Sequence, residues 1–403
     1  MALAQATRHA AGQVCRVLVV DDSAVIRGLI TNWLKSDPQI EIIGTASDGA
    51  KAIAAAEKGK PDVVVLDIEM PNMDGLTALP ELLAIRPRPK VIMASTLTRR
   101  NADISMQAMA AGASDYVPKP SATHEMTGSS NFKTELLAKV KAIGLRGPGA
   151  RKAIKLHKPA PVVRNFSAEA PAHRRTSPSG FKAEAKAAPA PQRAAQSKAT
   201  TFAKPATGIA HRKPTAVVIG SSTGGPQALF KLFESLTGKF NVPIFVTQHM
   251  PATFTRILAE HIERAANVQC AEAIDGEVVK PGRIYVAPGD YHMVISRKNT
   301  DLVVNLNQEP PINFCRPSVD PMFDSASDVF GNSLIAVMLT GMGHDGLDGS
   351  KKLVSNGGRL IAQDEQSSVV WGMPGAVAQA GLCEEVKPLN ELGPKLAQLL
   401  AGA

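Results

Sequence analysis

The segment GSSTGG, from Gly220 to Gly225, lies between an apolar run, TAVVI, and a stretch with helical periodicity, PQALFKLFESL. A glycine-rich turn from a strand to a helix can hold a phosphate on backbone N–H groups, or it can present a serine as a nucleophile. The segment matches neither the dinucleotide pattern G-x-G-x-x-G nor the P-loop pattern, which needs a lysine after the last glycine. It does fit G-x-S-x-G, so Ser222 is the candidate nucleophile and Ser221 is the alternative.

A serine hydroxyl is a poor nucleophile until a base takes its proton, and histidine is the usual base. The run PIFVTQHMP places His249 at the carboxyl end of the next predicted strand, on the same sheet edge as Ser222. His292 and His344 are weaker candidates, and His261 falls in a helical pattern that suggests a surface or packing role.

A third group, a carboxylate, must orient the imidazole. The run LIAVMLTGMGHDG places Asp345 just beyond a third predicted strand, and Asp348 and Asp290 are its competitors. The chain order Ser–His–Asp differs from that of α/β-hydrolases, but a triad is defined by geometry and roles.

A second group of polar residues lies in the first part of the chain. Asp21 and Asp22 follow the apolar run CRVLVV, Asp67 ends DVVVLDI, Ser95 ends KVIMAS, and Lys119 lies in DYVPKP. Three carboxylates suit Mg²⁺, which prefers oxygen ligands, and a lysine and a hydroxyl can bind phosphoryl oxygens. The pattern therefore predicts a magnesium-dependent phosphoacceptor, although a single aspartate at a strand end is usually turn chemistry.

The elements that position these residues are apolar runs alternating with amphipathic stretches. This alternation predicts two doubly wound, mostly parallel α/β sheets, one over residues 14–143 and one over residues 214–403. The stretch GRIYVAPGDYHMVISRKNTDLVVNL has hairpin-like alternation, so we expect an antiparallel edge on the second sheet.

Residues 144–213 read as a disordered linker rich in Ala, Pro and Lys. Between Arg146 and Lys213, 15 Lys and Arg face two acidic residues, a net charge of +13 within a chain total of +9, which leaves −4 for the rest. The basic character is thus a property of the linker, with a weak contact to anionic surfaces as the second interpretation. We expect no nucleic-acid partner, no membrane insertion and no export signal. With four scattered cysteines, a cytoplasmic location is the simplest expectation.

The first block resembles the receiver domain of two-component response regulators, through the acidic pair, the segment DIEMPNMDG and the late KP pair. The flavodoxin-like fold and several residue roles follow from that resemblance. It implies that Asp67 accepts a phosphoryl group from a histidine kinase and that Asp21, Asp22 and Asp67 bind Mg²⁺. Ser95, Lys119 and the aromatic Tyr116 match the switch positions of the family.

The second block resembles the catalytic domain of the chemotaxis protein-glutamate methylesterase (CheB) family. The resemblance rests on IGSSTGGPQAL, TQHMP, APGDYHM, RPSVDPMFDSA, LTGMGHDG and VVWGMPGAV. It implies a Rossmann-like esterase that needs no cofactor, with Ser222 as nucleophile, His249 as base, Asp345 as orienting acid and the Met342 N–H as oxyanion donor. The implied substrates are methylated glutamates, and specific glutamines for deamidation, on methyl-accepting chemotaxis receptors.

The order of receiver, linker and esterase also matches that family, and its implied regulation is relief of inhibition. We expect the unphosphorylated receiver to cover the face of the esterase that holds Ser222. The alternative function is a receptor-docking module without activity. The linker departs from the family pattern because it is unusually long and basic, which weakens the expectation of tight domain packing.

Overall fold

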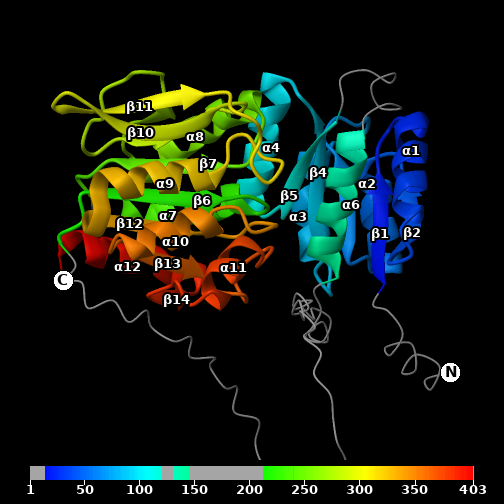
Figure 1. The fold of residues 1–403 in the computed structure, drawn as a ribbon. Helices are drawn as coiled ribbons and strands as arrows, with labels where there is room; N and C mark the ends of the chain where they lie inside the picture. Colours follow the sequence, from blue (N-terminus) through cyan, green and yellow to red (C-terminus); the bar gives the residue numbers. More distant parts are fainter. Residues whose placement is uncertain (1–13, 120–129, 146–211, 239, 403) are drawn as a thin grey trace, which may run out of the picture. The chain divides into compact units, whose positions relative to one another are not determined.

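The computed structural model describes residues 14–119, 130–145, 212–238 and 240–402 (Figure 1). Two parallel α/β domains lie within these ranges, which confirms the predicted fold class. Most of the predicted linker, residues 144–213, falls outside the described residues, as do His9, His124, His157, His173 and His211.

The first domain is a five-stranded sheet in the order β2-β1-β3-β4-β5, and every neighbouring pair is parallel. Its strands are β1 (Cys15–Val20), β2 (Ile40–Ala46), β3 (Val63–Asp67), β4 (Lys90–Thr96) and β5 (Asp115–Lys119). Its helices are α1 (Ala24–Lys35), α2 (Gly49–Gly59), α3 (Gly75–Ala84), α4 (Arg99–Ala111) and α6 (Ser130–Gly144).

Helices cover both faces of this sheet, which explains why its strands read as nearly continuous apolar runs. In β1, Val17 and Val19 pack in one cluster with side chains of α1 and α6. Their neighbours Leu18 and Val20 belong to a cluster with α2, α3 and α4. The polar residues lie instead at the carboxyl ends of the strands, where open α/β sheets bind ligands.

The second domain is a seven-stranded parallel sheet in the order β14-β13-β12-β6-β7-β9-β8. Its strands are β6 (Ala216–Ser221), β7 (Ile244–Gln248), β8 (Cys270–Glu272), β9 (Ile284–Val286), β12 (Leu334–Met338), β13 (Arg359–Gln363) and β14 (Glu385–Lys387). Its helices are α7 (Gly225–Leu236), α8 (Ala252–Ala266), α9 (Val319–Phe330), α10 (Leu347–Ser355), α11 (Met373–Gln379) and α12 (Leu389–Ala401), with a 3₁₀ turn, η1, at Gly331–Ser333.

The strand order reverses beside β6, which pairs with β7 on one side and with β12 on the other. In open α/β sheets, ligands bind at such a reversal, outside the carboxyl ends of the strands. β6, β7 and β12 end at Ser221, Gln248 and Met338. The loops that follow these strands carry the candidate residues.

The prediction of an antiparallel edge on the second sheet is wrong. β10 (His292–Lys298) and β11 (Asp301–Asn307) do form an antiparallel hairpin, but they make a separate two-stranded sheet. A turn at Gly289 and Asp290, where Asp290 has φ 72°, separates the hairpin from β9. The hairpin packs against α9 instead, because Met293 and Ile295 share a cluster with Met322 of that helix.

None of the helices in the described ranges combines the length and the apolar composition of a membrane-spanning segment.

Candidate functional site

Ser222 occupies a tight turn between β6 and α7. Its backbone N–H donates to the Thr340 carbonyl at 3.0 Å, and its own carbonyl accepts from the Gly225 N–H at 2.7 Å. Gly224 has φ 75°, a left-handed conformation that glycine adopts without steric penalty. A Cβ on Gly225 would lie 1.9 Å from Gln248 Oε1, so that position also needs glycine. The two glycines let the chain turn sharply directly after the serine.

The alternative nucleophile, Ser221, is turned into the sheet. It is fully buried, and its hydroxyl donates to Gln248 Oε1 at 2.7 Å. Gln248 in turn donates to the carbonyls of Ser222 and His249, at 2.9 and 3.1 Å. Ser221 therefore helps to fix the two strand ends, and the motif alone did not reveal this use of Gln248.

The imidazole of His249 lies between Ser222 and Asp345. Its Nδ1 is 3.1 Å from Ser222 Oγ, and its Nε2 is 2.6 Å from Asp345 Oδ2. An ionised carboxylate can only accept, so it selects the tautomer with the proton on Nε2. The lone pair of Nδ1 then faces the serine hydroxyl, which is the orientation that a general base requires.

Asp345 is 2% exposed and its carboxylate is saturated with donors. The N–H of Val319 donates to Oδ2 at 2.7 Å, and the hydroxyl of Ser318 donates to Oδ1 at 2.7 Å. The N–H of Gly346 and the Asn313 side chain add bonds to Oδ1 at 3.0 and 3.3 Å. Ser318 and Val319 begin α9, so the positive end of a helix also stabilises this charge.

These contacts shift the pKa values of the pair in opposite directions. Burial opposes the charged imidazolium, but the hydrogen bonds to Asp345 and Cys315 outweigh burial and raise the pKa of His249. Burial also opposes ionisation of Asp345, yet the bonds from His249, Ser318 and Val319 hold its pKa well below the usual range. Asp345 is thus a fixed negative charge, and His249 is a stronger base than a free imidazole.

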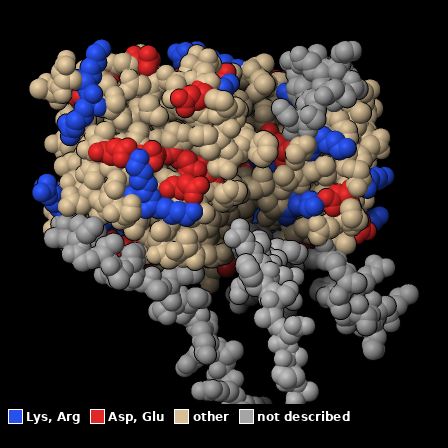
Figure 2. All heavy atoms as spheres, in the orientation of Figure 1, with Lys and Arg blue, Asp and Glu red and all other residues tan. Residues whose placement is uncertain are grey.

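The competing acids are engaged elsewhere. Asp348 binds Lys351 at 2.6 Å, with its side chain 81% exposed. Figure 2 shows acidic and basic side chains gathered over α9 and α10, and there Lys352 pairs with Asp324 and Asp328. Asp290 binds Arg316 at 2.7 Å. Among the three aspartates, Asp345 is the one that contacts His249.

The weaker histidine candidates do not join this group. His292 is buried, its Nδ1 accepts from the Ser318 N–H at 3.2 Å, and its Nε2 lies 3.3 Å from the Pro310 carbonyl. Both ring nitrogens are therefore used in holding the loop before α9. His344 is exposed, and His261 lies on α8.

Met342 lies on the loop after β12, next to the candidate nucleophile. A Cβ on the preceding residue, Gly341, would be 2.9 Å from Ser222 Cβ, so glycine is what lets this loop approach the serine. The Met342 N–H has no protein acceptor among the residues that the structure describes. A backbone donor to an oxyanion must be free of a protein acceptor in this way.

Sequence reasoning missed the loop before α9, which supplies three contacts to the group. Cys315 Sγ lies 3.4 Å from His249 Nδ1, Asn313 binds Asp345, and Ser318 binds Asp345. The segment RPSVD carried a usable signal, because serine before a helical run is typical of a helix start. No comparable signal marks Asn313 or Cys315.

In the first domain, Lys119 connects two of the three predicted carboxylates. Its ammonium lies 2.6 Å from Asp67 Oδ1 and 3.1 Å from Asp21 Oδ2, and all three residues are buried. Oxygens of Asp21, Asp22 and Asp67 lie within 4.8 Å of one another. That spacing of oxygen donors fits a Mg²⁺ ion.

This cluster carries more negative charge than Lys119 compensates. Burial raises the pKa of Asp67 to about 6, although Lys119 acts in the opposite direction. Burial raises the pKa of Asp21 as well, again against the effect of Lys119. Two buried carboxylates beside one ammonium are a favourable place for an added cation.

The predicted switch residues lie on strands next to the carboxylates. Ser95 Oγ is buried and lies 3.0 Å from Ser105 Oγ on α4. Tyr116 is 3% exposed, and Lys139 Nζ lies 5.0 Å from its ring centroid and donates to its carbonyl at 2.7 Å.

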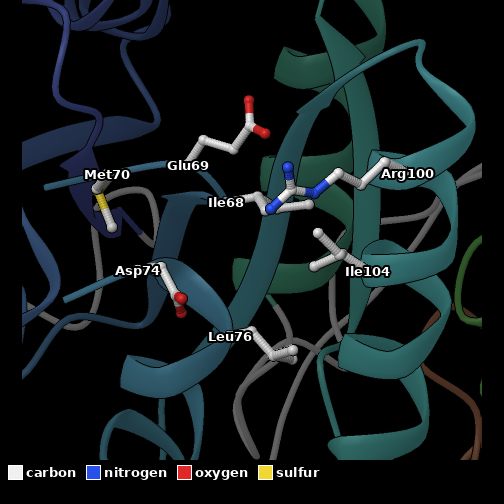
Figure 3. Close-up of a pocket in the computed structure, with 7 residues that line it drawn as sticks. All are labelled: Ile68, Glu69, Met70, Asp74, Leu76, Arg100 and Ile104. Carbon is white, nitrogen blue, oxygen red and sulfur yellow. The ribbon is translucent and has the colours of Figure 1, made fainter.

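A cavity of about 410 Å³ borders the loop that follows Asp67. Figure 3 shows Arg100 and Ile104 of α4 facing Ile68 and Glu69, the first residues after β3. The loop directly after Asp67 therefore borders a cavity that has a basic residue, Arg100, on its rim.

Fold and sites together define a class: a response-regulator receiver joined to an α/β domain of the serine-hydrolase type. Residues 17–130 match the response regulator receiver domain family, and residues 217–396 match the CheB methylesterase family.

Similar proteins extend this match over the whole chain. A protein-glutamate methylesterase/protein-glutamine glutaminase of Azospirillum brasilense is 50% identical over 401 residues, covering 98% of this chain and 95% of its own. A second, from Paramagnetospirillum magneticum, is 48% identical and covers 96% of both chains. The CheB methylesterase catalytic domain of Thermotoga maritima is similar at 42% identity, over 46% of this chain and 98% of its own, with a TM-score of 0.45. The chain belongs to the CheB family of protein-glutamate methylesterases, which confirms the resemblance.

Proposed function

We propose that this protein is a phosphorylation-activated serine esterase that hydrolyses glutamate methyl esters on chemotaxis receptors. The observation that carries the proposal is the pair of short contacts through His249, 3.1 Å to Ser222 Oγ and 2.6 Å to Asp345 Oδ2. The names of the relatives supply the substrate class.

In the proposed reaction, His249 Nδ1 takes the proton of Ser222 as Oγ attacks the γ-carbonyl of the ester. Asp345 holds the imidazolium that forms, and the Met342 N–H stabilises the negative oxygen of the tetrahedral intermediate. The imidazolium then protonates the leaving methoxide, and methanol departs. Water attacks the acyl-enzyme with His249 again as base, which releases glutamate and restores Ser222. Glutamine deamidation follows the same route with ammonia as the leaving group.

The receiver supplies the control. We infer that Asp67 accepts a phosphoryl group from a chemotaxis histidine kinase, and that Asp21, Asp22 and Asp67 hold Mg²⁺. The ion would offset negative charge around the phosphoryl oxygens. Lys119 already binds Asp67 Oδ1, so it is placed to bind a phosphoryl oxygen, and Ser95 and Tyr116 would respond to that change. The consequence of phosphorylation would be exposure of Ser222. We also propose that the protein works in the cytoplasm.

The decisive experiment is release of methanol from methylated receptor membranes by wild-type protein and Ser222→Ala. Ser222→Ala should lose the activity and still bind the membranes. Ser355→Ala is the matched control, because Ser355 is exposed and its hydroxyl donates only within its own helix, to the Lys352 carbonyl. Activity retained by Ser222→Ala would refute the assignment. Receptor binding without any methanol release by wild-type protein would favour the receptor-docking alternative.

A further inference from the structure

Phe314 is the most exposed large apolar side chain in the described part of the chain. Its relative exposure is 104%, against 64% for Ile274, the next highest. Burying a phenylalanine side chain stabilises a protein by about 1.5–3 kcal/mol. A fully exposed ring does not contribute this free energy to folding, but it can contribute it to binding a partner.

The backbone at this position is also unfavourable for its residue type. Phe314 has φ 64° and the preceding Asn313 has φ 51°, so two consecutive residues that are not glycine adopt the left-handed conformation. Asparagine tolerates that region, but for a bulky residue it is a genuine outlier. Backbone strain of this kind persists where the surroundings impose it, and it concentrates at binding and catalytic sites.

The surroundings do impose it here. Ile312 and Cys315 exchange two backbone hydrogen bonds, at 2.8 and 3.1 Å, and so close a tight turn with Phe314 at its tip. Arg316 fixes the base of the loop by binding Asp290 and the carbonyl of Gln308. The ring is thus presented by a braced loop.

The turn is anchored on the candidate triad itself. On one side of Phe314, Asn313 donates to Asp345 Oδ1 at 3.3 Å. On the other side, Cys315 Sγ lies 3.4 Å from His249 Nδ1. Successive Cα atoms are about 3.8 Å apart, so the exposed ring stands at the rim of the site.

We infer that Phe314 is a specificity-determining residue that packs against the receptor helix carrying the methylated glutamate. The inference rests on the proposed function and names the contact that selects the substrate. On a helix, residues three and four positions apart share one face. An apolar residue at that spacing from the methylated glutamate would meet the ring while the ester reaches Ser222. Met342, 36% exposed on the loop after β12, offers a second, adaptable apolar contact.

Phe314→Asn is the informative variant, because it removes the ring and suits the left-handed backbone. Phe314→Leu keeps an apolar side chain, and Ile274→Ala, at an exposed position beyond β8, is the matched control. The measurements are methanol release from methylated receptor membranes, methanol release from free glutamate γ-methyl ester, and thermal unfolding.

We expect Phe314→Asn to raise the KM for receptor membranes by about tenfold or more, since about 1.4 kcal/mol corresponds to one factor of ten. The ratio of receptor efficiency to free-ester efficiency should fall by a similar factor. Phe314→Leu should recover part of the loss, and Phe314→Asn should unfold at a higher temperature than wild type. Ile274→Ala should behave as wild type in every assay.

An unchanged KM for receptor membranes would overturn the inference. Equal losses on both substrates would also overturn it, because the ring would then act through His249. A change of oligomeric state in sedimentation would show that the ring covers a second copy of the chain, and would overturn it too. If wild-type protein releases no methanol from the receptor, the proposed function itself has failed.

Discussion

Replacing Asp345 with asparagine exchanges one carboxylate oxygen for an NH₂ group, and this change should nearly abolish the esterase activity. An asparagine side chain has one acceptor oxygen and one NH₂ group, whereas the carboxylate accepts at both oxygens. In this site both oxygens are occupied by donors, Oδ2 by His249 and Val319, and Oδ1 by Ser318, Gly346 and Asn313. An NH₂ group at either position therefore faces donors.

If the NH₂ group faces His249, the imidazole must offer it a lone pair on Nε2. The ring proton then moves to Nδ1, which faces Ser222 and can no longer accept its proton. The corresponding change in a serine protease triad lowers kcat by about 10⁴, and we expect a loss of that order here. The pKa of His249 should also fall, because its bond to Asp345 is the strongest of the contacts that raise it. The rising limb of the pH–rate profile should therefore move to lower pH.

Unfolding cannot produce a loss of that size. Hydrogen bonds to a charged group contribute about 1.5–3 kcal/mol each, so the variant should lose on the order of 3 kcal/mol of unfolding free energy. Even from a stability of about 5 kcal/mol, more than about nine molecules in ten would stay folded. The assay is methanol release across pH together with denaturant unfolding, and Asp348→Asn is the control because Asp348 contacts only exposed Lys351. Similar losses in the two variants, or an unchanged pH profile in Asp345→Asn, would refute this reasoning.

Three further predictions concern Asp67 and Cys315. Asp67→Asn should remove stimulation of the esterase by a small phosphodonor, and stimulation that persists would contradict the assignment. The same variant should be more stable at pH 7, by on the order of 3 kcal/mol, because each unit of the raised pKa is worth about 1.4 kcal/mol. Because burial raises the pKa of Asp67 to about 6, the folded state binds a proton that the unfolded state releases, and stability falls as pH rises through about 4 to 6. Thermal unfolding across that range should show the fall in wild type and a smaller fall in Asp67→Asn, where the raised pKa of Asp21 still contributes. Iodoacetamide should inactivate the esterase by alkylating Cys315, which lies 3.4 Å from His249 Nδ1, because burial protects Cys15, Cys270 and Cys383. Cys315→Ser should keep its activity after the same treatment, and equal inactivation of both proteins would place the reactive group elsewhere.

The three members of the candidate triad could be located from the sequence because each follows an apolar run. In a parallel sheet all such runs end at one edge, so residues far apart in the chain become neighbours there. Ser222, His249 and Asp345 satisfy that rule, as do Asp21 and Asp67 in the first domain. What remained open was the choice between adjacent residues: Ser221 or Ser222 depends on which side chain the strand turns inward.

The loop before α9 could not be placed in the same way. Its residues have neither helical nor strand periodicity, and Asn313 and Cys315 reach the triad only because the loop folds back in a turn that Arg316 fixes. The hairpin β10–β11 was misplaced for a related reason. Alternation shows that two strands pair with each other, but it does not show whether either of them joins a larger sheet. In both cases the missing information is tertiary.

Buried carboxylates are stabilised as anions in the esterase site but not in the receiver site, and this difference matches the proposed roles of the two sites. Asp345 is surrounded by donors, which hold its pKa well below the usual range and fix it as an anion before any substrate arrives. Asp67 and Asp21 share one ammonium, and burial raises the pKa of both. A preorganised charge suits a group that must stabilise an imidazolium within each turnover, because no reorganisation is then needed. An under-compensated cluster suits a site that must gain a cation and a phosphoryl group, because the unliganded state is the less stable one. The receiver domain thus contains an unfavourable cluster of carboxylates that a bound cation would relieve. The esterase domain contains a carboxylate that is already stabilised without a ligand.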